Sequence, residues 1–138
     1  MQLMMYGRSA NFTGSWKADL SRSRFLGPAP TALTAKIEHS DPELHLDMLV
    51  TKPDGSEDRV VLQCATTGEP DKSRLNGNTI RGNARWEGPE LVIESWARIG
   101  EREMHFHDCW SLSPDGQGLT MEHRKGDLAG QIVVLNRM

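Results

Sequence analysis

Residues 78–112, NTIRGNARWEGPELVIESWARIGEREMHFHDCWSL, decide the fold class of this chain. Two short interruptions, Gly88-Pro89 and Gly100-Glu101, divide the stretch into runs in which apolar and polar side chains alternate. Alternation with a period of two, bounded by Gly and Pro, is typical of β-strands joined by tight turns. The stretch therefore predicts consecutive antiparallel strands.

The register that these turns imply can be tested against polarity, because side chains that share one face of a sheet should match. The first turn sets Trp86 opposite Leu91, and the second sets Ser95 opposite Phe106. The other face carries a mostly polar set, which comprises Arg81, Asn83, Glu94, Trp96, His105 and His107. One face of the sheet is therefore predicted to be apolar and the other to face solvent.

The same pattern extends downstream and upstream. A short loop pairs Trp110 with Met121, and a turn at Gly126-Asp127 then places Ile132 and Val134 on the same apolar face. Upstream, a hairpin puts a set of apolar residues face to face, with Leu46, Met48 and Val50 opposite Cys64, Leu62 and Val60. We expect strands near residues 12–20, 31–40, 43–52, 58–66, 78–87, 90–98, 102–112, 118–125 and 128–137.

Consecutive hairpins that share an apolar face predict an all-β fold. The economical form is a single up-and-down antiparallel β-barrel of roughly eight to ten strands, because closure removes the exposed edges of the sheet. A chain of 138 residues fits one such domain. We expect an N-terminal extension over residues 1–10 and the barrel over 11–138, with residues 67–77 as a polar loop or a weak edge.

Composition argues against several classes of partner. The net charge is -3, from 16 basic and 19 acidic residues without a prominent basic run, so no nucleic-acid partner is expected. The longest apolar stretches, such as 132–135, are too short to span a membrane. Residues 1–10 lack the basic and apolar segments of a secretion signal. We therefore expect a soluble, cytoplasmic protein, with secretion or a periplasmic location open if a signal has been removed.

The two cysteines, Cys64 and Cys109, cannot make a disulfide framework. Strand parity places Cys64 inside the barrel and Cys109 outside, so we expect no disulfide between them.

The first expected strand contains residues 12–17, FTGSWK. This stretch resembles the first strand of lipocalins and fatty-acid-binding proteins, the calycin superfamily, in which a Gly-x-Trp motif begins the barrel. The layout of residues 12–137 is also similar to small bacterial lipocalin-like proteins. The resemblance implies a ligand-binding lumen. It also implies that Trp16 packs across the closed end of the barrel under a basic residue of the last strand, and Arg137 is placed for that role.

Two features depart from the fatty-acid-binding proteins. Those proteins insert two helices between their first two strands, where this chain has only a short connection. Their carboxylate-binding Arg-x-Tyr near the C-terminus is absent, because Tyr6 is the only tyrosine. A fatty-acid anion held in that manner is therefore not expected.

The apolar face carries one polar pair, Asp108 opposite His123, next to Ile93 and Phe106. A carboxylate beside an imidazole in an apolar cavity can orient the ring as an acid or base, or anchor a polar group of a ligand. The alternative is a solvated ion pair at a barrel mouth. The other candidate ligand-binding residues are large side chains of the same face, namely Trp86, Trp110, Met48, Met104, Met121 and Leu62. They would either wall a cavity or fill the barrel solidly.

On the outer face, His105 and His107 lie two positions apart, with Glu94 and Cys109 nearby. This is a weak candidate for a metal site, because alternating polar residues on a solvated strand give the same spacing. We expect no metal and no cofactor. Apolar residues assigned to the outside suggest a possible homodimer, with scattered exposure as the alternative; they are Leu49, Val61, Val92, Trp96, Val133 and Leu135.

The function we expect is non-enzymatic binding of a small hydrophobic or aromatic ligand in the lumen. The alternative is a small barrel enzyme of the isomerase or cyclase type, in which Asp108 orients His123 for proton transfer. No nucleophile elbow, phosphate loop or strong metal motif indicates a named reaction. A third possibility, a purely structural or interaction protein, predicts a packed lumen and a large apolar dimer face.

Overall fold

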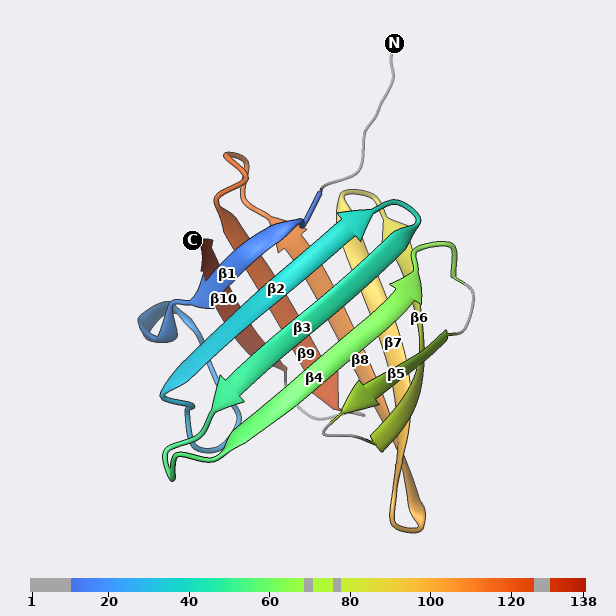
Figure 1. Ribbon diagram of the computed structural model, residues 1–138. Coiled ribbons are helices and arrows are strands. Elements are labelled where there is room, and N and C mark those ends of the chain that lie inside the picture. Colours follow the sequence, from blue (N-terminus) through green and yellow to red (C-terminus); the bar gives the residue numbers. More distant parts are fainter. Residues whose placement is uncertain (1–10, 69–70, 76–77, 126–129) are drawn as a thin grey trace.

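The computed structural model describes residues 11–68, 71–75, 78–125 and 130–138, and in these the regular secondary structure is almost wholly β-strand (Figure 1). In chain order the strands are β1 (Gly14–Ala18), β2 (Ala32–Ser40), β3 (Glu43–Thr51), β4 (Glu57–Ala65), β5 (Asp71–Leu75), β6 (Asn78–Glu87), β7 (Glu90–Ile99), β8 (Arg102–Leu112), β9 (Gly118–Lys125) and β10 (Gln131–Arg137). A single 3₁₀ turn, η1 (Leu20–Arg22), is the helical element of the described residues. The predicted extension over 1–10 lies outside them.

The sheet closes into a barrel in which each strand pairs with its neighbours along the chain, and β1 completes the ring by pairing with β10. This confirms the predicted all-β, up-and-down antiparallel barrel. Of the two alternatives expected for residues 67–77, a polar loop or a weak edge, the loop is wrong at β5, which pairs along β6 and meets β4 only at Val60–Leu75 and Val61–Arg74 in the described residues. Without β5 the edges of β4 and β6 would stay open, so ring closure outweighs the mostly polar local sequence.

Tight turns at Gly88 and Gly100 produce the two hairpins that the sequence indicated. Both glycines have positive φ, 63° and 65°, as two-residue hairpin turns require. The registers of β6, β7, β8 and β9 agree with the prediction, including Trp86 with Leu91 and Asp108 with His123. In the β3–β4 hairpin the pairing is two residues away from the predicted one, with Leu46 opposite Leu62. A shift of two keeps every side chain on its predicted face.

The predicted register of β10 was wrong by one residue. Val133 pairs with Met121, and Leu135 pairs with Leu119, so these two residues face inward in place of Ile132 and Val134. A shift of one residue exchanges the two faces of a strand. Residues 132–135 are all apolar, and alternation therefore gave no information about their parity.

This correction removes part of the predicted dimer surface. Val133 and Leu135 are core residues, with 4% and 0% of their surface exposed. Val92 does lie on the outer face but is buried there, between Arg85 and Cys109 on the flanking strands. Leu49, Val61 and Trp96 are only partly exposed. A homodimer stays a prediction, and the apolar surface that supports it is smaller than the sequence indicated.

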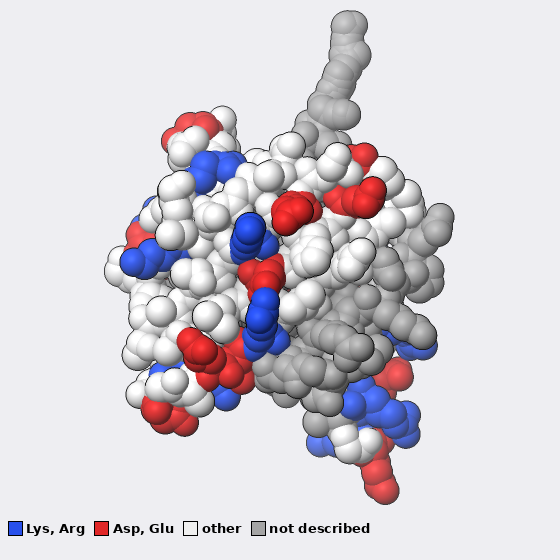
Figure 2. All heavy atoms as spheres, in the orientation of Figure 1, with Lys and Arg blue, Asp and Glu red and all other residues white. Residues whose placement is uncertain are grey.

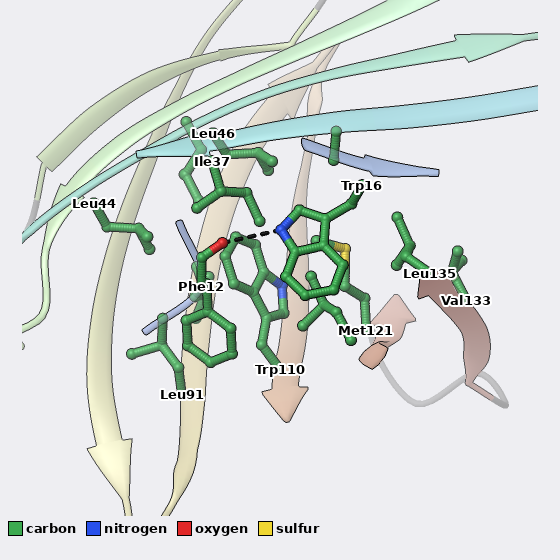
Figure 3. Close-up of a cluster of buried hydrophobic side chains, with 14 of the residues drawn as sticks. Phe12, Trp16, Ile37, Leu44, Leu46, Leu91, Trp110, Met121, Val133 and Leu135 are labelled. Carbon is green, nitrogen blue, oxygen red and sulfur yellow. Dashed lines mark hydrogen bonds between the residues drawn. The ribbon is translucent and has the colours of Figure 1, made fainter. Parts of the chain in front are cut away.

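The closed end of the barrel is built around Trp16, whose side chain is fully buried. Its Nε1 donates a hydrogen bond to the carbonyl oxygen of Phe12 at 3.0 Å, and Figure 3 shows this bond beside Trp110. The guanidinium of Arg137 lies 4.2 Å from the centre of the Trp16 ring and donates to the carbonyl oxygens of Thr13 and Gly116. The predicted partnership of Trp16 and Arg137 is confirmed.

The Gly-x-Trp motif has a steric reason in this structure. Gly14 has φ of 151°, and a Cβ built there would overlap Nη1 of Arg137. Glycine therefore lets the strand pass directly under the guanidinium that caps Trp16.

Basic and acidic side chains alternate on the face that Figure 2 shows, with no broad region of one sign. Ion pairs such as that between Arg59 and Asp47 account for part of this pattern. In the described part of the chain, no helix is long and apolar enough to cross a lipid bilayer.

Candidate functional site

The barrel is not filled by its own side chains. It contains a cavity of about 710 Å³, within the range typical of small-molecule sites. Most of the wall is apolar and comes from β2, β3, β4 and β7 to β10, through Leu33, Leu46, Met48, Val50, Val60, Leu62, Ile93, Phe106, Trp110, Met121 and Val133. The prediction of a packed lumen, which belonged to a purely structural protein, is wrong.

The mouth of the cavity lies at the end opposite Trp16. Phe25, Pro28 and Pro30 reach it from the β1–β2 connection, and Lys52 and Pro53 from the β3–β4 turn. In Figure 1 the connection and the turn lie close together at one end of the barrel. The connection is held to β10 by backbone hydrogen bonds between Arg24 and Ile132. This connection, residues 19–31, is called the strap below, and it occupies the place of the two helices of fatty-acid-binding proteins.

The polar part of the wall contains the predicted pair. Nδ1 of His123 lies 2.6 Å from Oδ1 of Asp108, and the imidazole stacks on Phe106 at 5.5 Å between ring centres. A carboxylate only accepts, so Nδ1 carries the proton and Nε2 is the acceptor of the neutral ring. The side chain of His123 is 35% exposed, and that of Asp108 is 23% exposed. Both line the cavity, so the pair is neither buried away from a ligand nor a fully solvated surface pair.

Most of the predicted ligand-binding residues meet at this cavity; those that line it are Asp108, His123, Phe106, Trp110, Met121, Ile93, Met48 and Leu62. Their role in binding stays a prediction. Two others do not line it. Met104 is not part of the cavity wall; it pairs with Ala97 of β7, and in the described residues the pairing of β8 with β9 begins two residues later, at Phe106.

Trp86 is the other residue that the structure moves away from the cavity. It stacks on Phe12 at 5.9 Å between ring centres, and its Nε1 donates to Oδ2 of Asp41 at 3.0 Å. Phe12, fully buried, plugs the closed end where parity alone had left Trp86 facing an open lumen. Trp86 is therefore part of the closed end.

Asp41 collects several polar contacts at that closed end. Its Oδ1 lies 2.6 Å from Nε2 of the buried His39 and accepts from Oγ1 of Thr66. Partial burial alone would raise the pKa of Asp41, but the hydrogen bonds from His39, Thr66 and Trp86 outweigh it and hold that pKa below its ordinary value. The backbone N–H of Phe12 donates to Nδ1 of His39 at 3.2 Å. This network holds Phe12 in place, and none of Asp41, His39 and Thr66 lines the cavity.

The outer-face histidines have ordinary cross-strand partners. His105 stacks on Trp96 and lies 3.1 Å from Oε2 of Glu94. Within residues 11–68, 71–75, 78–125 and 130–138, no group of three or more His, Cys, Asp and Glu side chains lies close enough to hold a metal ion. The weak metal hypothesis for His105 and His107 gains nothing from this geometry.

Neither cysteine is part of a disulfide, and Cys64 is buried inside the barrel whereas Cys109 is half-buried outside. Burial, together with the nearby Glu90 and Glu122 carboxylates, raises the pKa of the Cys109 thiol to about 11. A thiol of this kind is protonated at neutral pH and is a poor nucleophile or metal ligand.

Sequence reasoning missed several cavity residues. Ser95 faces inward in the predicted register, but a single hydroxyl among apolar neighbours forms no motif that would single it out. Gln131 and Val133 were lost through the parity error in β10. Phe25 and Pro30 belong to an irregular connection, where no periodicity exists to place them.

Comparisons with known proteins agree on the fold. The chain is similar to a secretory abundant heat soluble protein from Ramazzottius varieornatus, with a TM-score of 0.65 and 15% identity over 91% of this chain and 94% of that one. It is also similar to lipid binding protein 8 of Caenorhabditis elegans (TM-score 0.61, 11% identity, 92% and 95% coverage) and to a protein described as the REP1-NXSQ fatty acid transporter (0.63, 11%, 91% and 95%). No protein-family model and no curated protein sequence matches the chain. These likenesses show that the chain shares its barrel fold with those proteins, and this fold agrees with the one that the Gly-x-Trp resemblance implied.

Proposed function

We propose that this protein binds one small, largely apolar molecule in the barrel cavity, with the polar end of the molecule against Asp108 and His123. The observation behind the proposal is an open cavity of about 710 Å³ whose wall is mostly apolar and includes the polar pair Asp108 and His123. Apolar walls supply affinity through burial, and a few placed polar groups supply orientation.

The fold neighbours support the same class of function. Two of them are described as a lipid binding protein and a fatty acid transporter, although shared fold alone does not transfer a ligand. In this chain Trp110 lines the cavity next to the closed-end residue Phe12, and Phe25 lines it from the β1–β2 connection. A molecule that enters between the strap and the β3–β4 turn would reach Trp110, whose fluorescence then reports occupancy.

Two substitutions on adjacent residues of β4 test the proposal. Val60 lines the cavity, whereas Val61 points to the outer face. Val60→Trp should fill the lumen and abolish binding of Nile red to the delipidated protein, while Val61→Trp should bind it as the wild type does. Thermal melts establish that both variants are folded. Equal binding by the two variants would place the dye outside the barrel and contradict the proposal.

A proton-transfer enzyme is the second candidate, because the 2.6 Å contact between Asp108 and His123 at the cavity wall has the geometry of a base with its orienting acid. His123→Ala would then abolish turnover of a bound ketone or ene substrate while leaving most of its affinity. A panel of such ligands that bind and emerge unchanged from the wild-type protein would reject this candidate.

A further inference from the structure

The charges around the cavity discriminate between the possible polar ends of a ligand, an inference that rests on the proposed binding function. Among the described residues that line the cavity, the fixed charges are Asp54, Asp58, Asp108 and Lys52. Lys52 Nζ already lies 3.1 Å from Oδ2 of Asp58, and the imidazole of His123 already contacts Asp108. An incoming carboxylate would therefore find each of these basic groups engaged by an acid, and would add negative charge to a wall where acids are in excess.

The wall also presents a buried hydroxyl that faces the ligand space. Ser95 is only 6% exposed and lines the cavity. It lies opposite Phe106 on β8. The pair Ile93–Asp108, two residues away along each strand, is the neighbouring pair on the same face. No side-chain hydrogen bond of Ser95 to another described residue is present, although buried hydroxyls are normally satisfied. A polar ligand atom near Asp108 would supply that partner.

The carboxylate of Asp108 specifies the complementary chemistry. Its Oδ1 accepts from His123, and an ionised carboxylate has further acceptor positions. A ligand group that satisfies them must donate a hydrogen bond. We infer that the cavity selects an apolar molecule whose polar end is a donor, an alcohol or an amine, which donates to Asp108 and accepts from Ser95 where it has a lone pair, and that it discriminates against carboxylate-headed molecules.

Three ligands with the same chain test this inference: 1-dodecanol, dodecylamine and dodecanoic acid, each titrated at neutral pH against Nile red bound to the delipidated full-length protein. The alcohol and the amine should displace the dye at concentrations at least about tenfold lower than the acid, which corresponds to about 1.4 kcal/mol. An acid that competes as well as the alcohol overturns the inference while leaving the binding function intact. If neither Nile red nor any of the three ligands binds, by titration and by native mass spectrometry, the proposed function itself fails.

A matched pair of charge variants locates the effect. Asp108→Asn removes a negative charge inside the cavity, and Asp47→Asn removes one from the outer face of β3, where Asp47 pairs with Arg59. Asp108→Asn should strengthen dodecanoic acid binding, weaken dodecylamine binding and bring their ratio close to one, whereas Asp47→Asn should keep the wild-type ratio. Equal ratios in the two variants would contradict the assignment to Asp108.

Ser95→Ala provides an independent measurement if Asp108→Asn does not fold. Loss of one hydrogen bond should weaken dodecanol relative to dodecanoic acid by about threefold to tenfold. An unchanged ratio in a folded Ser95→Ala protein would remove the hydroxyl from the site and overturn its part in the inference.

Discussion

Replacing Arg137 by Met tests the closed end of the barrel, the feature that links the first strand to the last. The guanidinium donates to the carbonyl oxygen of Thr13 at 2.6 Å and to that of Gly116 at 3.2 and 3.0 Å, and it covers the Trp16 ring at 4.2 Å. Met retains much of the apolar stem but none of these interactions.

The expected cost follows from the interactions that the substitution removes. A hydrogen bond from a charged donor contributes roughly 1.5–3 kcal/mol, and a cation over an indole ring contributes about 0.5–2 kcal/mol. Arg137 is partly exposed, so water replaces some of these bonds in the variant. We expect Arg137→Met to lower the free energy of unfolding by about 2–4 kcal/mol, with a fall of roughly 10 °C in Tm.

Urea unfolding followed by tryptophan fluorescence measures this change. Arg137→Lys should lose an intermediate amount, because an ammonium keeps the charge but not the planar fork that reaches Thr13 and Gly116 together. Arg22→Met is the control, since the Arg22 side chain is 63% exposed and its guanidinium lies 3.9 Å from Asp19, and its unfolding midpoint should match the wild type. A loss below about 1 kcal/mol in Arg137→Met would refute a structural role for the cap.

Three further predictions concern stability and reactivity. Gly14→Ala should destabilise the barrel by about 1–3 kcal/mol, because φ of 151° and the overlap with Arg137 both penalise a Cβ; in a double-mutant cycle with Arg137→Met, part of this loss should disappear. Asp41→Asn should be less stable than the wild type at neutral pH, because the lowered pKa of Asp41 stabilises the fold above its ordinary value of 3.8. That difference should shrink as the pH falls below 3.8, measured by thermal unfolding across the acid range; a difference independent of pH would reject the carboxylate account. Cys109 should react slowly with iodoacetamide in the native protein at mildly alkaline pH, and faster as the pH approaches about 11. The pKa of Cys109 is raised from 9.0 to about 11, so the protonated thiol stabilises the folded state. This stabilisation should decline as the pH rises from 9.0 to about 11 in the wild type, and Cys109→Ser should show no such decline.

Much of the candidate site follows from alternation alone. The register of β7, β8 and β9 places Ile93, Asp108 and His123 on one inner face, because each of their turns has a defined length and each strand has a clear polarity pattern. The residue types then indicate an apolar inner face with one polar pair. Phe12 fills the closed end and so separates Trp86 from the cavity. This arrangement depends on a contact between segments far apart in the chain, which alternation does not predict.

The sequence by itself determined the fold class and the strands on either side of Gly88 and Gly100, and its resemblance to lipocalins and fatty-acid-binding proteins implied the contact between Trp16 and Arg137. Each of these rests on local turn chemistry, alternation or a short motif. Only the tertiary structure decided three other features: the parity of β10, the existence of β5 and the presence of an open lumen. Residues 132–135 are apolar on both faces, β5 is mostly polar although it closes the ring, and the volume inside a barrel depends on side-chain packing across it. These are properties of the closed sheet, to which residues from every strand contribute together.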